Sequence, residues 1–293
     1  MTPEVDVEGR RLRLSNLDKV LYPSIGFTKG QAIDYYSRVA PAVLPHLRGR
    51  ALTLKRYPDG VDGKFFYEKQ KPSHAPDWVA SATIPTGERD IDFVLCDDLA
   101  TLVWLANLAD LELHPSLALA AEPASPTVIA FDLDPGPPAA LAQCREVALL
   151  LRDTFAQLGM ECLAKTSGSK GMQVYVPLNT GADYDSVKPF AHAIAKLLES
   201  QHPKLVVSRM KKELRRGRVL IDWSQNDRHK TTVAVYSLRA RDRPTVSTPV
   251  TWDEVADGDA ELSFDSDEVL ERIDRHGDLF APVLELEQTL PDL

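Results

Sequence analysis

The segment TVIAFDLDPG, residues 127–136, places two aspartates one residue apart at the end of an apolar run. In a strand, residues i and i+2 point to the same face, roughly 6.5 Å apart, so Asp132 and Asp134 are predicted to project together. Pro135 and Gly136 follow at once and are predicted to end the strand. Two like charges so close repel each other unless a cation holds them, and hard divalent cations prefer oxygen ligands. The alternative is a solvated strand end, because the D-x-D string is common.

A third aspartate, Asp222, follows the apolar run Val219 to Ile221 and precedes WSQN. Three aspartates at strand ends can hold two hard cations. Two such ions, about 3.5 to 4 Å apart, stabilise the attacking and leaving oxygens of phosphoryl transfer. The pattern therefore predicts a metal-dependent phosphoryl-transfer site, with a metal-dependent nuclease as the alternative.

The stretch KTSGSKG, residues 165–171, lies between two predicted strands. Gly168 and Gly171 permit backbone NH groups to converge, and Ser167 and Lys170 add donors suited to phosphate oxygens. A plain hairpin loop explains the stretch equally well. The nuclease alternative has no need of such a triphosphate loop.

The net charge of −9 is distributed unevenly. From Asp253 to the end there are fourteen acidic residues and two arginines, whereas residues 204–243 contain twelve basic and four acidic residues. A basic segment attracts polyanions within a Debye length of about 8 to 10 Å. Nucleic acid is therefore a predicted partner, with a solvated basic face as the alternative.

The composition indicates a globular protein of a reducing compartment. The chain has 293 residues, of which 44% are hydrophobic and 26% charged, and this predicts a single catalytic module with its own core. Cys96, Cys144 and Cys162 lack CxxC spacing and are expected to be buried thiols. No apolar run approaches the roughly 20 residues needed to cross a bilayer, so we expect a cytoplasmic, nucleoid-associated protein without membrane contact.

Helical and strand periods interleave irregularly, which predicts an α/β fold with a mixed sheet and helical cover. Thr28 and Gln31 form a capping box for a helix whose later part Pro41 and Pro45 make doubtful. Further helices are predicted to begin at Asp97 or Asp98, after Gly136, and near Asp185. Strands are predicted at residues 111–114, 127–134, 172–178, 219–223 and 231–237.

The string LKRYPDGVDGKFFYEKQ, residues 54–70, interleaves basic and aromatic residues. Stacking of bases on aromatics beside cations that bind the backbone is typical of single-strand and template contacts. If Phe65 and Phe66 lie in a strand, one of them must face away from the core, so at least one exposed aromatic is expected. His114, at the end of a predicted strand, is interpreted from the sequence alone as a core histidine.

The strings LDKVLYP, FDLDPG, TSGSKG and IDWSQN, with the downstream KTTVAVYSLRAR, resemble in this order the polymerase domain of bacterial ligase D. That domain belongs to the archaeo-eukaryotic primase superfamily and serves non-homologous end joining. The resemblance runs from about Leu14 to Arg272 and implies a two-lobed primase-polymerase core. It also implies a DNA-dependent polymerase that extends primer 3′-hydroxyls with NTPs in preference to dNTPs, with Ku and an ATP-dependent DNA ligase as partners. Gap filling in excision repair and a non-catalytic module that bridges DNA ends are the alternatives.

The resemblance also assigns site residues. Two Mn²⁺ or Mg²⁺ ions are implied, with Asp132 and Asp134 bridging both and Asp222 holding the ion nearer the primer 3′-hydroxyl. The residues that match nucleotide ligands of the family are Lys55, His114, Ser167, Lys170, Gln225 and Arg239. Lys19 and Lys29 match lysines that bind the 5′-phosphate of the downstream DNA strand, and Phe65 and Phe66 match aromatics that stack on the template. Lys29 also begins a predicted helix, where the dipole and the NH groups favour an anion.

Three portions of the module are expected: a DNA-end-binding portion at about residues 1–95, a catalytic core at about 96–250 and an acidic C-terminal segment at about 251–293. The chain ends soon after the polymerase region, and its starting methionine and acidic tail favour a free-standing relative over an excised piece. The metal-binding cysteine cluster of eukaryotic-type primases is missing from the sequence, which argues against efficient unassisted primer synthesis.

Overall fold

The computed structural model describes residues 3–87 and 89–291, which form two compact units. Unit 1 contains the described residues within 1–116, 231–247 and 264–277, and unit 2 contains those within 117–230, 248–263 and 278–293. Each unit is therefore assembled from separate stretches of chain, and the units do not coincide with the three portions expected from the sequence. Among the described residues, no helix is long and apolar enough to cross a bilayer.

Unit 2 is built on a six-stranded sheet in the order β13-β14-β10-β12-β11-β15. Of these neighbouring pairs, β13 and β14 are parallel and the others antiparallel, which confirms the predicted mixed sheet. The strands are β10 (Val128–Pro135), β11 (Leu163–Thr166), β12 (Met172–Pro177), β13 (Val206–Val207), β14 (Val219–Asp222) and β15 (Pro249–Val250). The helices are α3 (Leu141–Gln157), α4 (Tyr184–Gln201), α5 (Trp252–Ala256) and α7 (Pro282–Glu285), with the 3-10 turns η1 (Lys212–Leu214) and η2 (Trp223–Gln225).

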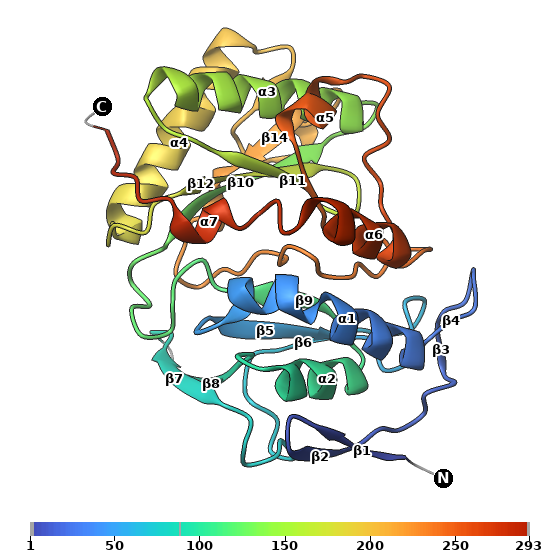
Figure 1. Ribbon diagram of the computed structural model, residues 1–293. Helices are drawn as coiled ribbons and strands as arrows, with labels where there is room; N and C mark the ends of the chain where they lie inside the picture. The colour runs from blue at the N-terminus through green and yellow to red at the C-terminus, as the bar shows by residue number, and fades with distance from the viewer. Residues whose placement is uncertain (1–2, 88, 292–293) are drawn as a thin grey trace. The chain divides into compact units, whose positions relative to one another are not determined.

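The helices α3 and α4 cover one face of this sheet (Figure 1). Phe131 of β10 packs against Phe155 of α3 with ring centroids 5.6 Å apart, and Phe155 in turn meets Phe190 of α4 at 6.4 Å. Because side chains alternate along a strand, Asp132 and Asp134 point to the opposite face. The apolar residues of FDLDPG thus secure the strand in the core while its acids stay outside it.

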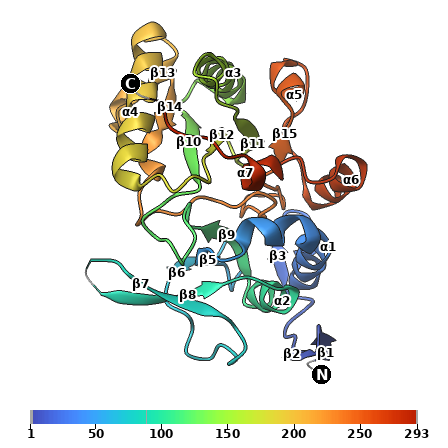
Figure 2. The ribbon, with the colours of Figure 1, turned by 60° about the vertical axis from the view of Figure 1, so that its left-hand side comes forward.

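Unit 1 contains a five-stranded sheet, in which β9 pairs with β5 beside the path β6-β5-β8-β7. Its strands are β5 (Ala51–Arg56), β6 (Phe66–Glu68), β7 (Ser81–Pro85), β8 (Asp90–Leu95) and β9 (Asp110–Pro115). Two small hairpins, β1 (Glu4–Val7) with β2 (Arg10–Arg13) and β3 (Val20–Tyr22) with β4 (Phe27–Thr28), precede the helices α1 (Lys29–Leu47), α2 (Leu99–Asn107) and α6 (Ser266–His276). Figure 2 shows α1 beside α2 and α6, and α1 contacts both helices.

The first helix of unit 1 begins as predicted but runs further than its prolines suggest. Thr28 caps α1 through the backbone N of Gln31, and the capping box is complete. The helix continues through Pro41 and Pro45 to Leu47. A proline inside a helix removes one backbone hydrogen bond. Burial of most of the last turns, including Leu47, outweighs that loss here.

The prediction of a strand at residues 231–237 is wrong. After a single bridge between Thr231 and Ser116, the segment follows an irregular path, and Tyr236 has a positive φ of 63°. Residues 232–238 are buried without interruption, whereas a half-buried strand would alternate. The backbone N of Thr232 and of Ala234 still donates to the carbonyl O of Pro115 and of Leu113 in β9, so the segment is buried beside β9 without forming a regular strand. By contrast, the predicted buried thiols Cys96, Cys144 and Cys162 are confirmed.

Candidate active site

A row of polar side chains crosses the sheet of unit 2. Strand pairing places Asp222 opposite Asp132, Asp132 opposite Gln173, and Gln173 opposite Lys165. Residues in register on neighbouring strands point to the same face, so these four side chains form one line across β14, β10, β12 and β11. We call Asp222, Asp132, Gln173 and Lys165 the carboxylate row. Asp134 lies on the same face, two residues further along β10.

Hydrogen bonds along the row orient Asp132. The ammonium of Lys165 donates to the amide oxygen of Gln173, and the amide nitrogen of Gln173 donates to Oδ1 of Asp132 at 3.0 Å. Because an ammonium can only donate, it fixes which end of the Gln173 amide faces Asp132. The Lys165 side chain is fully buried, so this relay is part of the core.

The other two carboxylates have different neighbours. Asp134 is half exposed, at 51%, and its Oδ2 lies 3.9 Å from Nη1 of Arg215. Asp222 accepts hydrogen bonds from the backbone N of Ser224 at 2.9 Å and from Nε2 of Gln225 at 2.8 Å. Gln225, predicted as a nucleotide ligand, therefore contacts a predicted metal ligand directly.

The surroundings of Asp132 and Asp134 disfavour the charged form of each carboxylate. Burial, then the charge of Asp134, raise the pKa of Asp132 well above its ordinary value, although the hydrogen bond from Gln173 opposes the shift. Burial and the charge of Asp222 raise the pKa of Asp134 in the same way. Like charges on one sheet face are thus incompletely compensated by the protein itself.

This donor chemistry fits a hard divalent cation, which prefers carboxylate oxygens and would relieve the repulsion. Within residues 3–87 and 89–291, however, no group of three or more His, Cys, Asp and Glu side chains is arranged to hold a metal ion. Both oxygens of Asp222 accept hydrogen bonds, Oδ1 from Ser224 and Oδ2 from Gln225. The three carboxylates are thus of the residue type that binds a metal, while hydrogen bonds within the protein set the side-chain orientations of Asp132 and Asp222.

The predicted phosphate loop connects β11 and β12. Oγ of Ser167 accepts hydrogen bonds from the backbone N of Ser169 and of Gly171, each at 3.2 Å, so these NH groups point into the loop. At Gly171 a Cβ would lie 2.0 Å from the carbonyl O of Leu133, so only glycine permits this approach to β10. The loop is thereby held beside the DLD strand, and Lys170 is exposed on it.

A second polar cluster lies in unit 1, centred on Glu112 of β9. Glu112 is 1% exposed, and its Oε2 lies 3.0 Å from Nζ of Lys55, 3.1 Å from Nε2 of His114 and 3.4 Å from Nε of Arg239. The Tyr57 hydroxyl lies 3.3 Å from Oε1. The structure thus brings together three of the predicted nucleotide ligands around a carboxylate. We call Glu112, Lys55, His114 and Arg239 the Glu112 cluster.

The Glu112 cluster carries excess positive charge. Burial alone would raise the pKa of Glu112, but the hydrogen bond from His114 and the charge of Arg239 outweigh it, and this pKa lies well below its ordinary value. Burial lowers the pKa of His114, so the imidazole is neutral near pH 7 and donates its Nε2 proton to the carboxylate. Lys55 and Arg239 therefore face one negative charge with two positive ones.

The two lysines predicted to bind a 5′-phosphate are neighbours in unit 1. The backbone N of Lys29 donates to the carbonyl O of Lys19 at 2.8 Å, and the Lys29 ammonium donates to Oγ of Ser15 at 3.2 Å. Burial, followed by the charges of Lys19 and Arg56, lowers the pKa of Lys29 to about 8. Lys19 is 39% exposed and pairs with Asp59 at 3.0 Å. The site is a cationic helix start whose charges repel one another.

The predicted template aromatics are exposed, Phe65 to 51% and Phe66 to 43%. The Phe66 ring lies 5.1 Å from the guanidinium of Arg56, and the Phe65 ring 4.8 Å from the ammonium of Lys55. Tyr67, at 58% exposure, lies 6.2 Å from His114. The expected exposed aromatic surface is present, and it adjoins cations.

Sequence reasoning missed Glu112, Gln173, Lys165 and Arg215. For Glu112 a signal existed, because it precedes His114 by two residues and so shares its face of the strand. Gln173 and Lys165 become visible only through the register of the sheet, which the sequence does not encode locally. Arg215 lies in the basic segment but gave no sign of its proximity to Asp134.

The chain belongs to the family described as LigD, primase-polymerase domain, which matches residues 28–280. A solved structure, the polymerase domain from Mycobacterium tuberculosis ligase D in complex with DNA, matches with a TM-score of 0.89 and 40% identity. That match covers 95% of this chain and 99% of the solved one. The α/β fold expected from the resemblance is thereby confirmed.

Curated relatives agree with this assignment. The multifunctional non-homologous end joining protein LigD of Mycolicibacterium smegmatis is 44% identical over 276 residues, which is 93% of this chain and 36% of that protein. The bifunctional non-homologous end joining protein LigD of Bacillus subtilis is 32% identical over 269 residues, or 91% of this chain and 43% of that protein. The chain thus spans less than half the length of these relatives.

Proposed function

We propose that this protein is a DNA-dependent nucleotidyltransferase that extends primer 3′-hydroxyls with NTPs, or less readily dNTPs, during the repair of broken DNA ends. The observation that carries the proposal is the register that sets Asp222 opposite Asp132 while Asp134 shares their face. Membership of the LigD primase-polymerase family supports it. A non-catalytic end-bridging module would have no use for three acids gathered on one sheet face.

Asp132, Asp134 and Asp222 would hold two Mg²⁺ or Mn²⁺ ions, which when bound supply charge neutralisation at the α-phosphate. Gln173 keeps Asp132 in one orientation through the Lys165 relay, and Gln225 does the same for Asp222. These hydrogen bonds give the carboxylates of Asp132 and Asp222 defined orientations on the sheet. Lys170 offsets negative charge on the triphosphate.

The Glu112 cluster binds the nucleotide through its surplus cations. Lys55 and Arg239 attract anionic oxygens, while neutral His114 remains a hydrogen-bonding group. Lys19 and Lys29 bind the 5′-phosphate of the downstream strand, and Phe65 and Phe66 stack on the template. Ku and an ATP-dependent DNA ligase are the proposed partners, because the relatives that match are named as end-joining proteins.

Extension of a 5′-phosphorylated gapped duplex tests the proposal, with NTPs and dNTPs compared in Mg²⁺ and in Mn²⁺. The double variant Asp132→Ala with Asp134→Ala should abolish extension while binding to the gapped DNA stays largely intact. Asp259→Ala, a change to an exposed acid of the same unit, is the matched control and should extend normally. Extension that persists in the double variant would remove the proposed site.

A further inference from the structure

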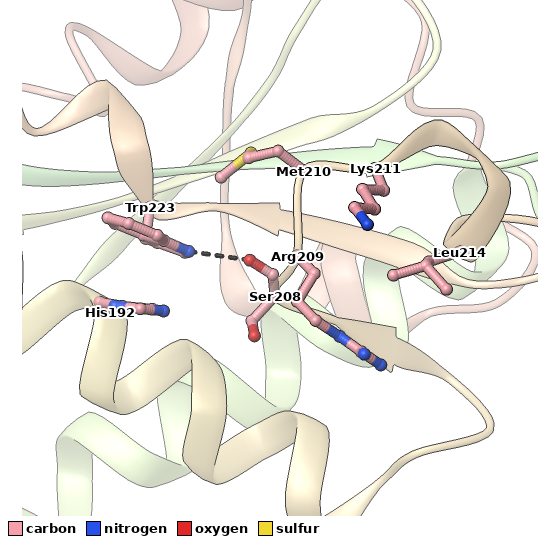
Figure 3. Close-up of a pocket in the computed structure, with 7 residues that line it drawn as sticks. All are labelled: His192, Ser208, Arg209, Met210, Lys211, Leu214 and Trp223. Carbon is pink, nitrogen blue, oxygen red and sulfur yellow. Dashed lines mark hydrogen bonds between the residues drawn. The ribbon is translucent and has the colours of Figure 1, made fainter.

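A cavity of about 450 Å³ in unit 2 has no part in the function described so far. Figure 3 shows it between a pair of stacked rings and a loop that carries basic and apolar side chains. The lining residues are His192, Ser208, Arg209, Met210, Lys211, Leu214 and Trp223. Its volume is within the range of pockets that enclose small organic ligands.

One wall of the cavity is a fixed aromatic surface. The rings of His192 and Trp223 stack with centroids 3.8 Å apart and an interplanar angle of 16°. The indole NH of Trp223 donates to the carbonyl O of Ser208 at 2.9 Å, which locks the ring in its plane. Burial, and then the charge of Lys196, lower the pKa of His192, so this wall is neutral near pH 7. A rigid, neutral aromatic wall suits a flat, uncharged ring.

The opposite side of the cavity is positively charged. Residues 209–218, RMKKELRRGR, contain six basic residues and one acid. Arg209 and Lys211 line the cavity and are exposed, although Arg209 also lies 3.1 Å from Glu199. Met210, which is 37% exposed, adds an apolar contact between them. An aromatic wall beside flexible cations matches a base attached to its phosphate.

Two of the carboxylates, Asp222 and Asp134, are connected to residues that line the cavity. Trp223 directly follows Asp222 in the chain. Arg215 also connects them, since its Nη2 donates to the carbonyl O of Met210 at 2.7 Å and its Nη1 lies 3.9 Å from Oδ2 of Asp134. The cavity lining is therefore close to both Asp222 and Asp134.

We propose that this cavity binds an unpaired nucleobase of a DNA strand, stacked on the His192 and Trp223 pair, with the adjoining phosphates on Arg209 and Lys211. The inference rests on the proposed function, because it takes a DNA strand to lie at the carboxylates. The pocket would hold a base that cannot pair when a frayed or mismatched end is presented for extension.

Two short single-stranded DNA oligomers test the proposal, one with 2-aminopurine at a central position and one with an abasic site there. The phosphates are identical, so the ratio of their dissociation constants isolates the base. The wild type should bind the base-bearing oligomer about 5- to 100-fold more tightly and quench its fluorescence. Trp223→Leu should lower this ratio and reduce the quenching.

Further variants separate loss of the pocket from misfolding. Met210→Ala shortens an exposed side chain and should also lower the ratio, whereas Leu197→Ala, an exposed residue of α4 outside the lining, should preserve it. Arg209→Ala with Lys211→Ala should weaken both oligomers equally. Equal binding of the two oligomers by the wild type, or an unchanged ratio in Trp223→Leu and Met210→Ala, overturns the proposal.

A competition experiment and an extension assay complete the test. If a nucleoside monophosphate displaces the 2-aminopurine oligomer at a concentration similar to that of the oligomer itself, the cavity is a mononucleotide site and the proposal is wrong. Primer extension is measured on the same wild-type preparation. If the wild type extends primers but binds the two oligomers equally, the proposed pocket is refuted and the proposed function is not. If the wild type does not extend primers, the proposed function is refuted.

Discussion

Replacement of Glu112 by glutamine removes a buried negative charge from the Glu112 cluster while almost preserving the shape of the side chain. In the wild type this carboxylate lies 3.0 Å from Lys55 and 3.4 Å from Arg239, and the side chains of both are less than 15% exposed. The variant therefore leaves two buried cations facing an amide. Because both cations are largely buried, the loss of their counter-charge destabilises the folded state.

The magnitude follows from the burial. Removal of one partner from a buried ion pair costs about 3 to 5 kcal/mol, because the other charge stays behind. The amide oxygen of glutamine still accepts a hydrogen bond, so we expect about 3 kcal/mol for Glu112→Gln. For a chain of this size, that loss lowers Tm by roughly 6 to 12 °C.

The effect should depend on pH in a defined sense. The folded pKa of Glu112 lies below its unfolded value of about 4.5, so the stabilisation is complete above pH 4.5 and is lost as the pH falls through the folded pKa. The difference in unfolding free energy between wild type and variant should thus be constant from about pH 5 to 7 and shrink at lower pH. Urea unfolding at several pH values measures it.

Glu68→Gln is the matched control, because Glu68 pairs with Arg56 at 2.7 Å but its side chain is 26% exposed. Partly exposed pairs are worth about 0 to 1 kcal/mol, so the control should change Tm little. Inorganic tripolyphosphate should stabilise Glu112→Gln more than the wild type, since the anion replaces the missing charge. A loss in Glu112→Gln no greater than in the control would refute the reasoning about the Glu112 cluster.

Further outcomes are expected elsewhere. Gln173→Leu removes an acceptor of Lys165 and should cost about 1 to 3 kcal/mol in urea unfolding, with an unchanged midpoint counting against the relay. Gly171→Ala forces a Cβ to within 2.0 Å of a backbone oxygen and should lower Tm by several degrees, whereas Gly258→Ala, with no atom within 4 Å, should not. Lys29→Ala should weaken binding only to 5′-phosphorylated gapped DNA. In the wild type that preference should decline as the pH rises through about 8, where Lys29 loses its proton, and a flat profile from pH 7 to 9 would contradict the assignment.

Local sequence signals predicted the elements that depend on nearby residues. The capping box of Thr28 and Gln31 marks the start of α1, and Asp98, one of the two predicted candidates, caps α2. These signals succeed because a cap acts within a few residues of itself. The same approach failed for the segment 231–237, because Val233 and Val235 suit a buried irregular segment as well as a strand.

The sequence by itself determined that Asp132 and Asp134 share a face, because side chains alternate along a strand whatever the strand pairs with. It also determined the basic segment at 204–243 and the aromatics among cations at 54–70. Only the tertiary structure decided that Asp222 lies opposite Asp132. The two strands are antiparallel, so the fact that both acids lie near strand ends does not by itself place them together. The register of the pair does so. A shift of one residue would turn Asp222 to the other face, and the register is selected by which face of the sheet is buried, which depends on the elements that pack against it.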